Sequence, residues 1–326
     1  MTISNSIIVH SIIAEEEIAH VLSSILMIEV NVTLVTSGFC EVYQVRSSDG
    51  VVGFFKLFGA NRSDWVRLSA LCSFLLSLGE CGCRVSKPLE LRPGEKIIAF
   101  TSPEGSRAGI LFDAAKGREV KYEKFSVETA IQYGEGLGEI HGASQKILSH
   151  KQLDLPVFSV GDRLKQARIA LELSTQQNVY DFSSLLDCSR IWEVPDLVEQ
   201  KVVCHGDAHG QNACLADGAF TFFDFEYFGV CEASYDLSTF LWVFLLIRDD
   251  RDNAEKLFEG LMSGYQRVVD VKNITLSRFI HYACIRHLWY IALQLELATI
   301  KGTSVLNEAD IFKLVQRVID LAATDL

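Results

Sequence analysis

Two carboxylates and an amide lie close together in the sequence between Cys204 and Glu226. Asp207 comes first, Asn212 follows five residues later, and Asp224 follows twelve residues after that. Phosphoryl transfer from ATP needs one oxygen that orients the attacking hydroxyl and two ligands that hold Mg²⁺ on the phosphates. The residue types and their spacing therefore predict phosphoryl transfer at this stretch of the chain.

A hairpin is expected to bring the two proposed metal ligands together. Asp217-Gly218 separates two apolar runs, and Asp-Gly between such runs is a strong signal for a two-residue turn. If these two residues form the turn, Asn212 lies opposite Phe223 and therefore beside Asp224. Mg²⁺ commonly takes one or two protein ligands and completes its octahedron with phosphate oxygens and water. His205 is expected to be a buried structural histidine.

The text HGDAHGQN, followed by FFDFEYFGVCEASYDLSTFLW, resembles the aminoglycoside phosphotransferase and choline kinase family of the protein-kinase-like superfamily. The usual pattern is H-G-D-x-H-x-x-N, a hydrophobic strand, D-F, then a glycine and a later D-L. Gly229 and Asp236-Leu237 fill the last places here. The resemblance covers most of the chain and is sharp between Val203 and Trp242.

The resemblance implies Asp207 as the catalytic base, Asn212 and Asp224 as the Mg²⁺ ligands, and ATP as the phosphoryl donor. It also implies a two-lobed α+β fold of the protein-kinase-like kind. Residues 1–115 would form a nucleotide-binding lobe with a small antiparallel sheet. Residues 116–326 would form a mainly helical lobe for catalysis and substrate binding.

The first part of the chain reads as a helix followed by a kinase-like sheet. The helix spans Ala14–Leu26. Three strands follow, separated by a loop of small residues and a turn, and these strands span Val32–Val35, Glu41–Val45 and Val51–Phe58. The loop at Ser37-Gly38 would let backbone N–H groups approach phosphates. Lys56, between two aromatics on the third strand, is the expected partner of the α- and β-phosphates.

The next helix departs from the kinase pattern. It is expected from Arg62 to Leu78, and its apolar residues at helical spacing are Trp65, Leu68, Leu71, Cys72 and Leu75. Kinases place here a glutamate that pairs with the strand lysine, but Leu71 or Cys72 falls at that position. Glu41 or the nucleotide alone would then orient Lys56, or else the affinity for nucleotide would be weak.

The remaining small-lobe strands and the inter-lobe hinge follow. The strands are expected at Val85–Glu90, Lys96–Thr101 and Gly109–Phe112. The small, polar residues after Phe112 form the expected hinge, where backbone groups around Phe112 and Ala114 would read adenine.

The second part of the chain is mostly helical by its apolar spacing. A first helix covers Val127–Ala143 and contains His141, expected to be structural. Residues 154 to 200 are less regular. Four further helices are expected at Tyr235–Arg248, Asn253–Val269, Leu276–Ala298 and Glu308–Ala323.

Composition limits the class of protein. The chain has 326 residues and a net charge of −12, and nucleic-acid binding would need a basic footprint instead. Nine cysteines lie without paired metal-ligand spacing, and the N-terminus does not read as a signal peptide. We expect reduced thiols, a cytoplasmic protein and no membrane partner; the oligomeric state stays open.

Three functions compete. The first is a small-molecule kinase that acts on an aminoglycoside-, choline-, homoserine- or natural-product-like hydroxyl. The second is a Ser/Thr protein kinase of the bacterial stress-response type, which the small-lobe text also resembles. The third is a nucleotide-binding pseudokinase, because the helix glutamate is missing.

The sequence does not identify the acceptor, but its composition bears on the charge that the acceptor carries. The net charge of −12 makes a cationic or neutral acceptor easier to attract than an anionic one. The late helices carry side chains that could hold it, although a solvated loop and ordinary core residues explain any single one of them better. The acidic residues are Asp249, Asp250, Asp252 and Glu255, and the aromatic residues are Trp242, Trp289 and Tyr290.

Overall fold

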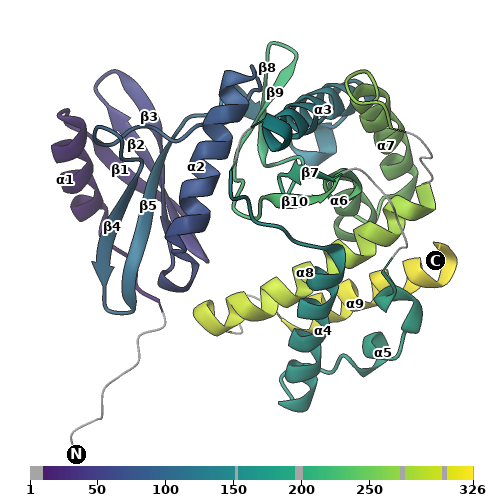
Figure 1. Cartoon of the computed structure of the whole chain (residues 1–326). Coiled ribbons are helices and arrows are strands. Elements are labelled where there is room, and N and C mark those ends of the chain that lie inside the picture. Colours follow the sequence, from purple (N-terminus) through teal and green to yellow (C-terminus); the bar gives the residue numbers. More distant parts are fainter. Residues whose placement is uncertain (1–9, 151–152, 195–200, 272–275, 303–306, 326) are drawn as a thin grey trace, which may run out of the picture. The chain divides into compact units, whose positions relative to one another are not determined.

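The computed structural model describes residues 10–150, 153–194, 201–271, 276–302 and 307–325, which divide into two compact units. The N-terminal unit comprises the residues up to Gly79 together with Val85–Ala115. The C-terminal unit comprises Glu80–Arg84 and the chain from Lys116 onward (Figure 1). Within the described ranges, none of the helices combines the length and the apolar character that a membrane crossing needs.

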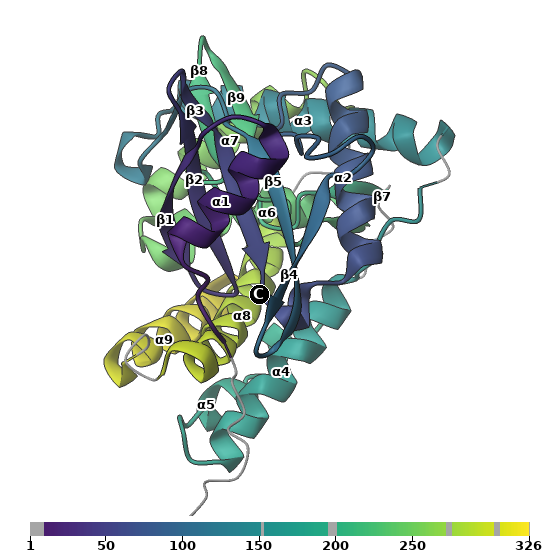
Figure 2. The ribbon, with the colours of Figure 1, turned by 90° about the vertical axis from the view of Figure 1, so that its left-hand side faces the viewer.

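The N-terminal unit is built on a five-stranded antiparallel sheet in the order β1-β2-β3-β5-β4. Helices α1 (Glu15–Leu26) and α2 (Trp65–Glu80) lie on opposite faces of this sheet (Figures 1 and 2). The short 3-10 helix Ala60–Arg62 precedes α2. The strands are β1 (Asn31–Ser37), β2 (Cys40–Ser47), β3 (Gly50–Phe58), β4 (Ile97–Ser102) and β5 (Gly105–Asp113).

Strand alternation separates the two faces of the sheet. Because neighbouring residues of a strand point to opposite faces, every second side chain of β2 and β3 faces α1. Ile18 and Leu22 of α1 pack on that face, in one core cluster with Tyr43, Val45, Phe55 and Leu57. The same register places Lys56 on the other face, directly across from Val42 of β2 and Ile110 of β5.

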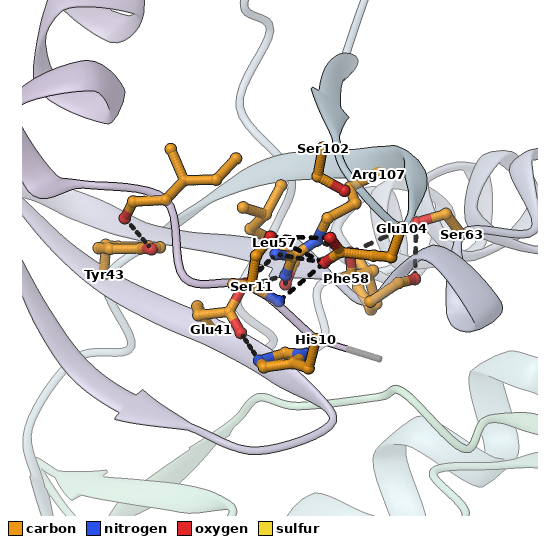
Figure 3. Close-up of polar contacts among 12 residues, drawn as sticks. His10, Ser11, Glu41, Tyr43, Leu57, Phe58, Ser63, Ser102, Glu104 and Arg107 are labelled. Atoms are coloured by element: carbon orange, nitrogen blue, oxygen red, sulfur yellow. Dashed lines mark hydrogen bonds and ion pairs between the residues drawn. The ribbon is translucent and has the colours of Figure 1, made fainter. Parts of the chain in front are cut away.

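A buried ionic network ties the start of the described chain to this sheet (Figure 3). The Arg107 guanidinium is fully buried, pairs with Glu41, and donates from Nε to the carbonyl of Phe58 over 2.9 Å and from Nη1 to the carbonyl of Ser11 over 2.7 Å. His10 contacts the other Glu41 oxygen over 2.6 Å. The Glu41 carboxylate therefore belongs to the face covered by α1.

The expected strand at Val85–Glu90 is wrong. This segment runs beside β5 but forms an isolated bridge at Pro88 and Phe112, flanked by backbone hydrogen bonds from Leu89 and to Lys87. Pro88 has no N–H to donate, so a regular ladder cannot form through it. Trp65 also differs from expectation, because it begins α2 at 39% exposure instead of joining the buried stripe.

Short strands of the C-terminal unit carry the loop predicted to be catalytic. β7 (Lys201–Cys204) pairs with β10 (Gly229–Glu232), and the hairpin of β8 (Ala213–Ala216) and β9 (Ala219–Phe222) pairs with β6 (Arg118–Glu119). The predicted Asp217-Gly218 turn is confirmed. Both residues have positive φ, +51° and +75°, as a type I′ hairpin turn requires.

Helices make up most of the C-terminal unit. The predicted late helices are confirmed, with α6 continuing as a π-helical turn (Val243–Ile247). α3 and α7 approach closely at Gly134, which has no side chain. A Cβ at this position would lie only 2.0 Å from the Leu261 carbonyl oxygen. The larger helices are α3 (Val127–His150), α4 (Val160–Gln176), α6 (Ala233–Trp242), α7 (Arg251–Tyr265), α8 (Leu276–Lys301) and α9 (Glu308–Asp325). Shorter ones are Tyr122–Lys124, α5 (Ser183–Leu186) and Ser189–Trp192.

Helix α4 was missed by the sequence reading, which expected residues 154 to 200 to be irregular. Its start is a capping box: Ser159 accepts from the Asp162 backbone N–H, and the Asp162 side chain accepts from Ser159. Leu164, Ala167 and Leu171 then form its buried face. The Ser159-x-x-Asp162 spacing is the local sequence signal for this helix start.

Candidate functional site

The predicted site residues fall on both units. Asp207, Asn212 and Asp224 lie in the C-terminal unit, between β7 and the end of the β8–β9 hairpin. The predicted nucleotide-binding residues lie in the N-terminal unit, where Ser37 ends β1, Gly38 begins the β1–β2 connection, Lys56 is on β3, Phe112 is on β5 and Ala114 follows it. Lys56 is 7% exposed, with its Nζ 5.4 Å from the Phe58 ring centroid.

Asp207 and Asn212 are joined across one tight loop. The Asn212 side-chain Nδ2 donates to the Asp207 carbonyl oxygen over 2.9 Å and lies 3.5 Å from its carboxylate Oδ2. The Asn212 backbone N–H donates to the His209 carbonyl over 2.9 Å. These bonds fix the Asp207 carboxylate relative to the Asn212 amide.

Asp236 holds the first half of the same loop. Its fully buried carboxylate accepts from the backbone N–H of His205 over 2.6 Å and of Gly206 over 2.9 Å. Gly206 has φ +82°, and a Cβ there would lie 2.1 Å from the Tyr227 carbonyl oxygen, so the loop admits only glycine at this point.

His141 completes this support. Its Nε2 lies 3.0 Å from the Asp236 Oδ2, and its Nδ1 lies 2.9 Å from the Tyr265 hydroxyl. His141, Cys204 and Asp236 bring their ligand atoms within 4.8 Å of one another, a spacing that could suit a metal. Both Asp236 oxygens already accept backbone N–H groups, so we assign the cluster a structural role.

His205 is fully buried, as expected from the sequence. Its Nε2 donates to the Phe223 carbonyl over 2.8 Å, and its ring stacks on Phe225 with centroids 4.1 Å apart. The Phe223 backbone N–H in turn donates to the Asn212 carbonyl over 3.0 Å. His205 therefore ties the loop to the open end of the hairpin, which carries Asp224.

The structure adds Arg286 of α8 to the site. Its Nη2 donates to the Asp207 Oδ1 over 2.5 Å, and the guanidinium is only 3% exposed. Burial by itself would raise the pKa of the Asp207 carboxyl, but the charge of Arg286 and its hydrogen bond act against burial, and the pKa is lowered to about 2. Asp207 is therefore ionised at neutral pH.

His209 forms the other side of Asp207. Its Nε2 lies 3.8 Å from the Asp207 Oδ2, while its Nδ1 contacts the Tyr122 hydroxyl over 2.9 Å. Burial lowers the pKa of His209 despite the opposing charge of Asp207, so the ring is neutral at neutral pH.

The donor set fits a hard divalent cation. Asn212 is 7% exposed, and because its Nδ2 binds the Asp207 carbonyl, its Oδ1 is directed away from that carbonyl. Asp224 adds a carboxylate from the adjoining hairpin end, where its φ is +65°. An amide oxygen and a carboxylate are ligands that Mg²⁺ accepts while keeping positions for phosphate and water.

Glu41 cannot orient Lys56, contrary to one expectation from the sequence. β2 and β3 pair Glu41 with Leu57 and Val42 with Lys56. Directly opposed residues share a face of the sheet, so the Glu41 carboxylate and the Lys56 ammonium leave on opposite faces. Glu41 instead neutralises the buried Arg107. At the expected glutamate position on α2, Leu71 and Cys72 are 3% and 4% exposed.

The acidic residues after α6 interact with groups close to them in the fold. The Asp250 side chain caps α7 by accepting from the Asn253 N–H. Glu255 pairs with Arg251 on the exposed face of that helix, and Asp249 lies 3.5 Å from Arg317. The solvated-loop interpretation therefore holds for this cluster.

The aromatic residues of α6 and α8 belong to the interior, but they do more than fill it. Trp242 is 4% exposed and donates from Nε1 to the His287 Nδ1 over 3.0 Å. The Arg286 guanidinium lies 4.2 Å from the Trp242 ring centroid and 4.8 Å from that of Trp289. An arginine that interrupts the apolar middle of α8 was the sequence signal for this site residue.

The fold and the loop around Asp207 define a protein-kinase-like phosphotransferase. A model of the phosphotransferase enzyme family matches residues 109–269 of the chain. The resemblance to aminoglycoside phosphotransferases and choline kinases is thereby confirmed. No curated protein matches the chain by sequence.

Solved structures confirm the protein-kinase-like α+β fold. An amicoumacin kinase in complex with AMP-PNP, Ca²⁺ and Ami superposes with a TM-score of 0.69 at 15% identity, over 90% of this chain and 88% of that one. The choline kinase LicA from Streptococcus pneumoniae gives 0.65 at 16% identity, over 95% and 99%. A spectinomycin phosphotransferase in complex with ADP and spectinomycin gives 0.61 at 16% identity, over 97% and 99%.

Proposed function

We propose that the protein transfers the γ-phosphoryl group of ATP to a hydroxyl of a small molecule and that the reaction depends on Mg²⁺. The observation that carries the proposal is the loop in which Asp207 and Asn212 are hydrogen-bonded to each other, with Asp224 directly after Phe223, whose backbone N–H bonds the Asn212 carbonyl. A carboxylate for the hydroxyl and two oxygen ligands for the metal are the groups that phosphoryl transfer requires.

Asp207 acts on the acceptor. Since its carboxyl has a pKa of about 2, it is a weak base, and its main contribution is to orient the hydroxyl by accepting a hydrogen bond. It takes up the proton as the new oxygen–phosphorus bond forms. Asn212 and Asp224 would hold Mg²⁺, which would offset the negative charge that develops on the phosphates during transfer.

The N-terminal unit binds the nucleotide in this proposal. Lys56 contacts the α- and β-phosphates, the backbone at Ser37 and Gly38 covers the phosphates, and the backbone at Phe112 and Ala114 receives adenine. Supporting observations are the buried position of Lys56 on β3 and the place of Ala114 directly before the boundary between the units. Related folds bind AMP-PNP and ADP in solved structures.

A small acceptor is favoured over a protein. The segment from Asp224 to Asp236 is filled by β10 and the first turn of α6, which leaves no activation segment to dock a peptide. The amicoumacin, spectinomycin and choline kinases of this fold support the same choice.

A cytoplasmic location is supported by nine free cysteines, which suit a reducing compartment.

Radiolabelled ATP tests the function directly. The protein is incubated with Mg²⁺ and either a small-molecule extract or intact cell protein. We expect label in a small-molecule product and ADP release that depends on the extract. Labelled serine or threonine in protein, without a small-molecule product, would establish the protein-kinase alternative. Nucleotide binding with no transfer to either pool would establish the pseudokinase.

A further inference from the structure

Arg286 has unused hydrogen-bond donors beside Asp207, the residue that is proposed to orient the acceptor hydroxyl. An arginine side chain carries five N–H donors on three nitrogens. Asp207 takes one bond, from Nη2, whereas Nε and Nη1 are buried and have no hydrogen-bond partner among the described residues. Buried donors of a charged group are costly to leave unpaired, so these two nitrogens point to a ligand.

A second guanidinium lies close by on α4. Arg163 is 4.0 Å from the Trp289 ring centroid and 4.7 Å from that of Phe158, and Trp289 is also the ring 4.8 Å from Arg286. The buried Nε of Arg163 has no hydrogen-bond partner within the described ranges either. The two cations thus gather around one indole.

A buried hydroxyl joins them. The Tyr235 hydroxyl of α6 has no hydrogen-bond partner in the described part of the chain, and the residue is fully buried. Burial raises the pKa of Tyr235 to about 12, while the positive charges of Arg163 and Arg286 act against that rise. The Tyr235 ring lies 5.3 Å from that of Phe158, the ring that the Arg163 guanidinium also covers at 4.7 Å.

We propose that the phosphoryl acceptor carries an anionic group, a carboxylate, beside its hydroxyl, and that Arg286 and Arg163 receive this group with the Tyr235 hydroxyl while Asp207 holds the acceptor hydroxyl. Guanidinium groups bind carboxylates through paired, charge-assisted hydrogen bonds. A cationic acceptor would instead meet the like charges of Arg286 and Arg163 at this position, which disfavours it. This identification of the acceptor class rests on the proposed function.

The local charge therefore opposes the charge of the whole chain. The net charge of −12 suggested a cationic or neutral acceptor. That sum includes exposed groups such as Asp249 and Glu255, which are paired elsewhere or solvated. At the distance of a hydrogen bond, the nearest buried charges decide which ligand binds, since exposed charges are screened over about 10 Å.

The test divides candidate acceptors by charge before the reaction. A small-molecule extract is separated by ion exchange into anionic, neutral and cationic fractions, freed of nucleotides, and each fraction is incubated with labelled ATP and Mg²⁺. We expect labelled product from the anionic fraction. Defined pairs extend the test: glycerate against glycerol, and 3-hydroxybutyrate against 1,3-butanediol, with choline as the cation. A product from the cationic or neutral fraction alone, or from choline or glycerol in preference to the acids, would overturn the proposal.

Substitutions test whether the two arginines cause the preference for an anionic acceptor. Arg163→Gln and Arg286→Lys should each raise the KM for the anionic acceptor by about 10- to 100-fold, the range that loss of a charge-assisted hydrogen bond produces. Arg168→Gln is the matched control, because Arg168 lies on the same helix but is exposed and pairs with Glu172. If the variants raise the KM for ATP and not for the acceptor, the arginines serve the transferred phosphoryl group and the proposal is wrong.

Binding without turnover separates this inference from the proposed function. In a thermal-denaturation series without ATP, the anionic fraction should stabilise the wild type and Arg168→Gln but not Arg163→Gln. Such stabilisation with no phosphoryl transfer would contradict the proposed function and keep the anion site. Equal stabilisation of all three proteins, or none of the wild type, would contradict the anion site whatever the transfer assay shows.

Discussion

The Asn212 side chain donates a hydrogen bond to the backbone carbonyl of Asp207 over 2.9 Å. One residue therefore has two duties: its amide nitrogen closes the loop that presents Asp207, and its amide oxygen is left for the metal. The two duties can be separated by substitution, because aspartate retains the oxygen and loses the donor.

Removal of the proposed metal ligands should affect nucleotide binding unequally. Asp224→Ala removes a charged ligand and should weaken Mg²⁺-dependent nucleotide binding by at least about tenfold, since even outer-shell changes cost 10- to 100-fold. Asn212→Ala should weaken it less, because a neutral amide is the poorer ligand. Nucleotide titrations with and without Mg²⁺ measure both. An unchanged Mg²⁺ dependence in Asp224→Ala would remove that residue from the metal site.

Asn212→Asp is the companion variant. It should retain much of the Mg²⁺ dependence while lowering turnover, because the bond to the Asp207 carbonyl is lost. If it behaves like Asn212→Ala in both assays, the loop bond has no role of its own.

Asp207→Asn should lower turnover by about 10²- to 10⁴-fold, the usual loss when an acid–base group is removed. Affinity for Mg-ATP should be largely kept, because Asp207 acts on the acceptor. The assay is steady-state ADP release, with nucleotide binding measured in parallel. A turnover number close to that of the wild type would exclude Asp207 from the mechanism.

Lys56→Ala and Glu41→Gln should affect different properties, nucleotide binding and stability, because the two side chains lie on opposite faces of the sheet. Lys56→Ala should raise the KM for ATP. Glu41→Gln should instead lower the free energy of unfolding by about 3–5 kcal/mol, since it removes the nearer of the two carboxylates that pair with the buried Arg107. A rise in the KM for ATP in Glu41→Gln, without loss of stability, would show that Glu41 acts on the nucleotide after all.

Asp236→Asn should destabilise the protein by about 3–5 kcal/mol, because its carboxylate is fully buried and serves His141 and two backbone N–H groups. Urea denaturation measures the change. Asp249→Asn, at a side chain that is 66% exposed, is the control and should be nearly neutral. Equal stability of the two variants would contradict the assigned role of Asp236.

His287 should make stability fall with acidification. Burial lowers its pKa to about 4, and its ring nitrogens bind the Trp242 Nε1 and the Leu314 carbonyl. Below about pH 6.5 the unfolded chain takes up a proton that native His287 does not, so the free energy of unfolding decreases until about pH 4, by on the order of 3 kcal/mol in total.

The measurement compares urea denaturation at pH 7 and pH 5. The wild type should lose about 2 kcal/mol more than His287→Gln over this interval. His150→Gln, at an exposed histidine, should follow the wild type. Parallel pH dependences of the wild type and His287→Gln would rule out the buried neutral ring as the cause.

Local sequence signals determined the loop and the hairpin. The Asp217-Gly218 turn, the strands β1 to β3 and the late helices follow from turn chemistry and apolar spacing, which act between residues near in sequence. The motif from His205 to Asp224 gave the family and the expected ligands for the same reason. Two differences from expectation, at Pro88 and at α4, also have local causes. Proline has no N–H for a strand ladder, and a capping box starts α4.

The tertiary structure alone decided which charges meet. Asp207 and Arg286 are 79 residues apart, and only the packing of α8 beside the loop brings their side chains into contact. The register of β2 and β3 sends Glu41 and Lys56 to opposite faces, which a count of charges along the chain cannot reveal. Spacing in sequence fixes which groups are available, but interactions between charges depend on distance and burial in the folded chain, and these set the sign of the charge around Asp207.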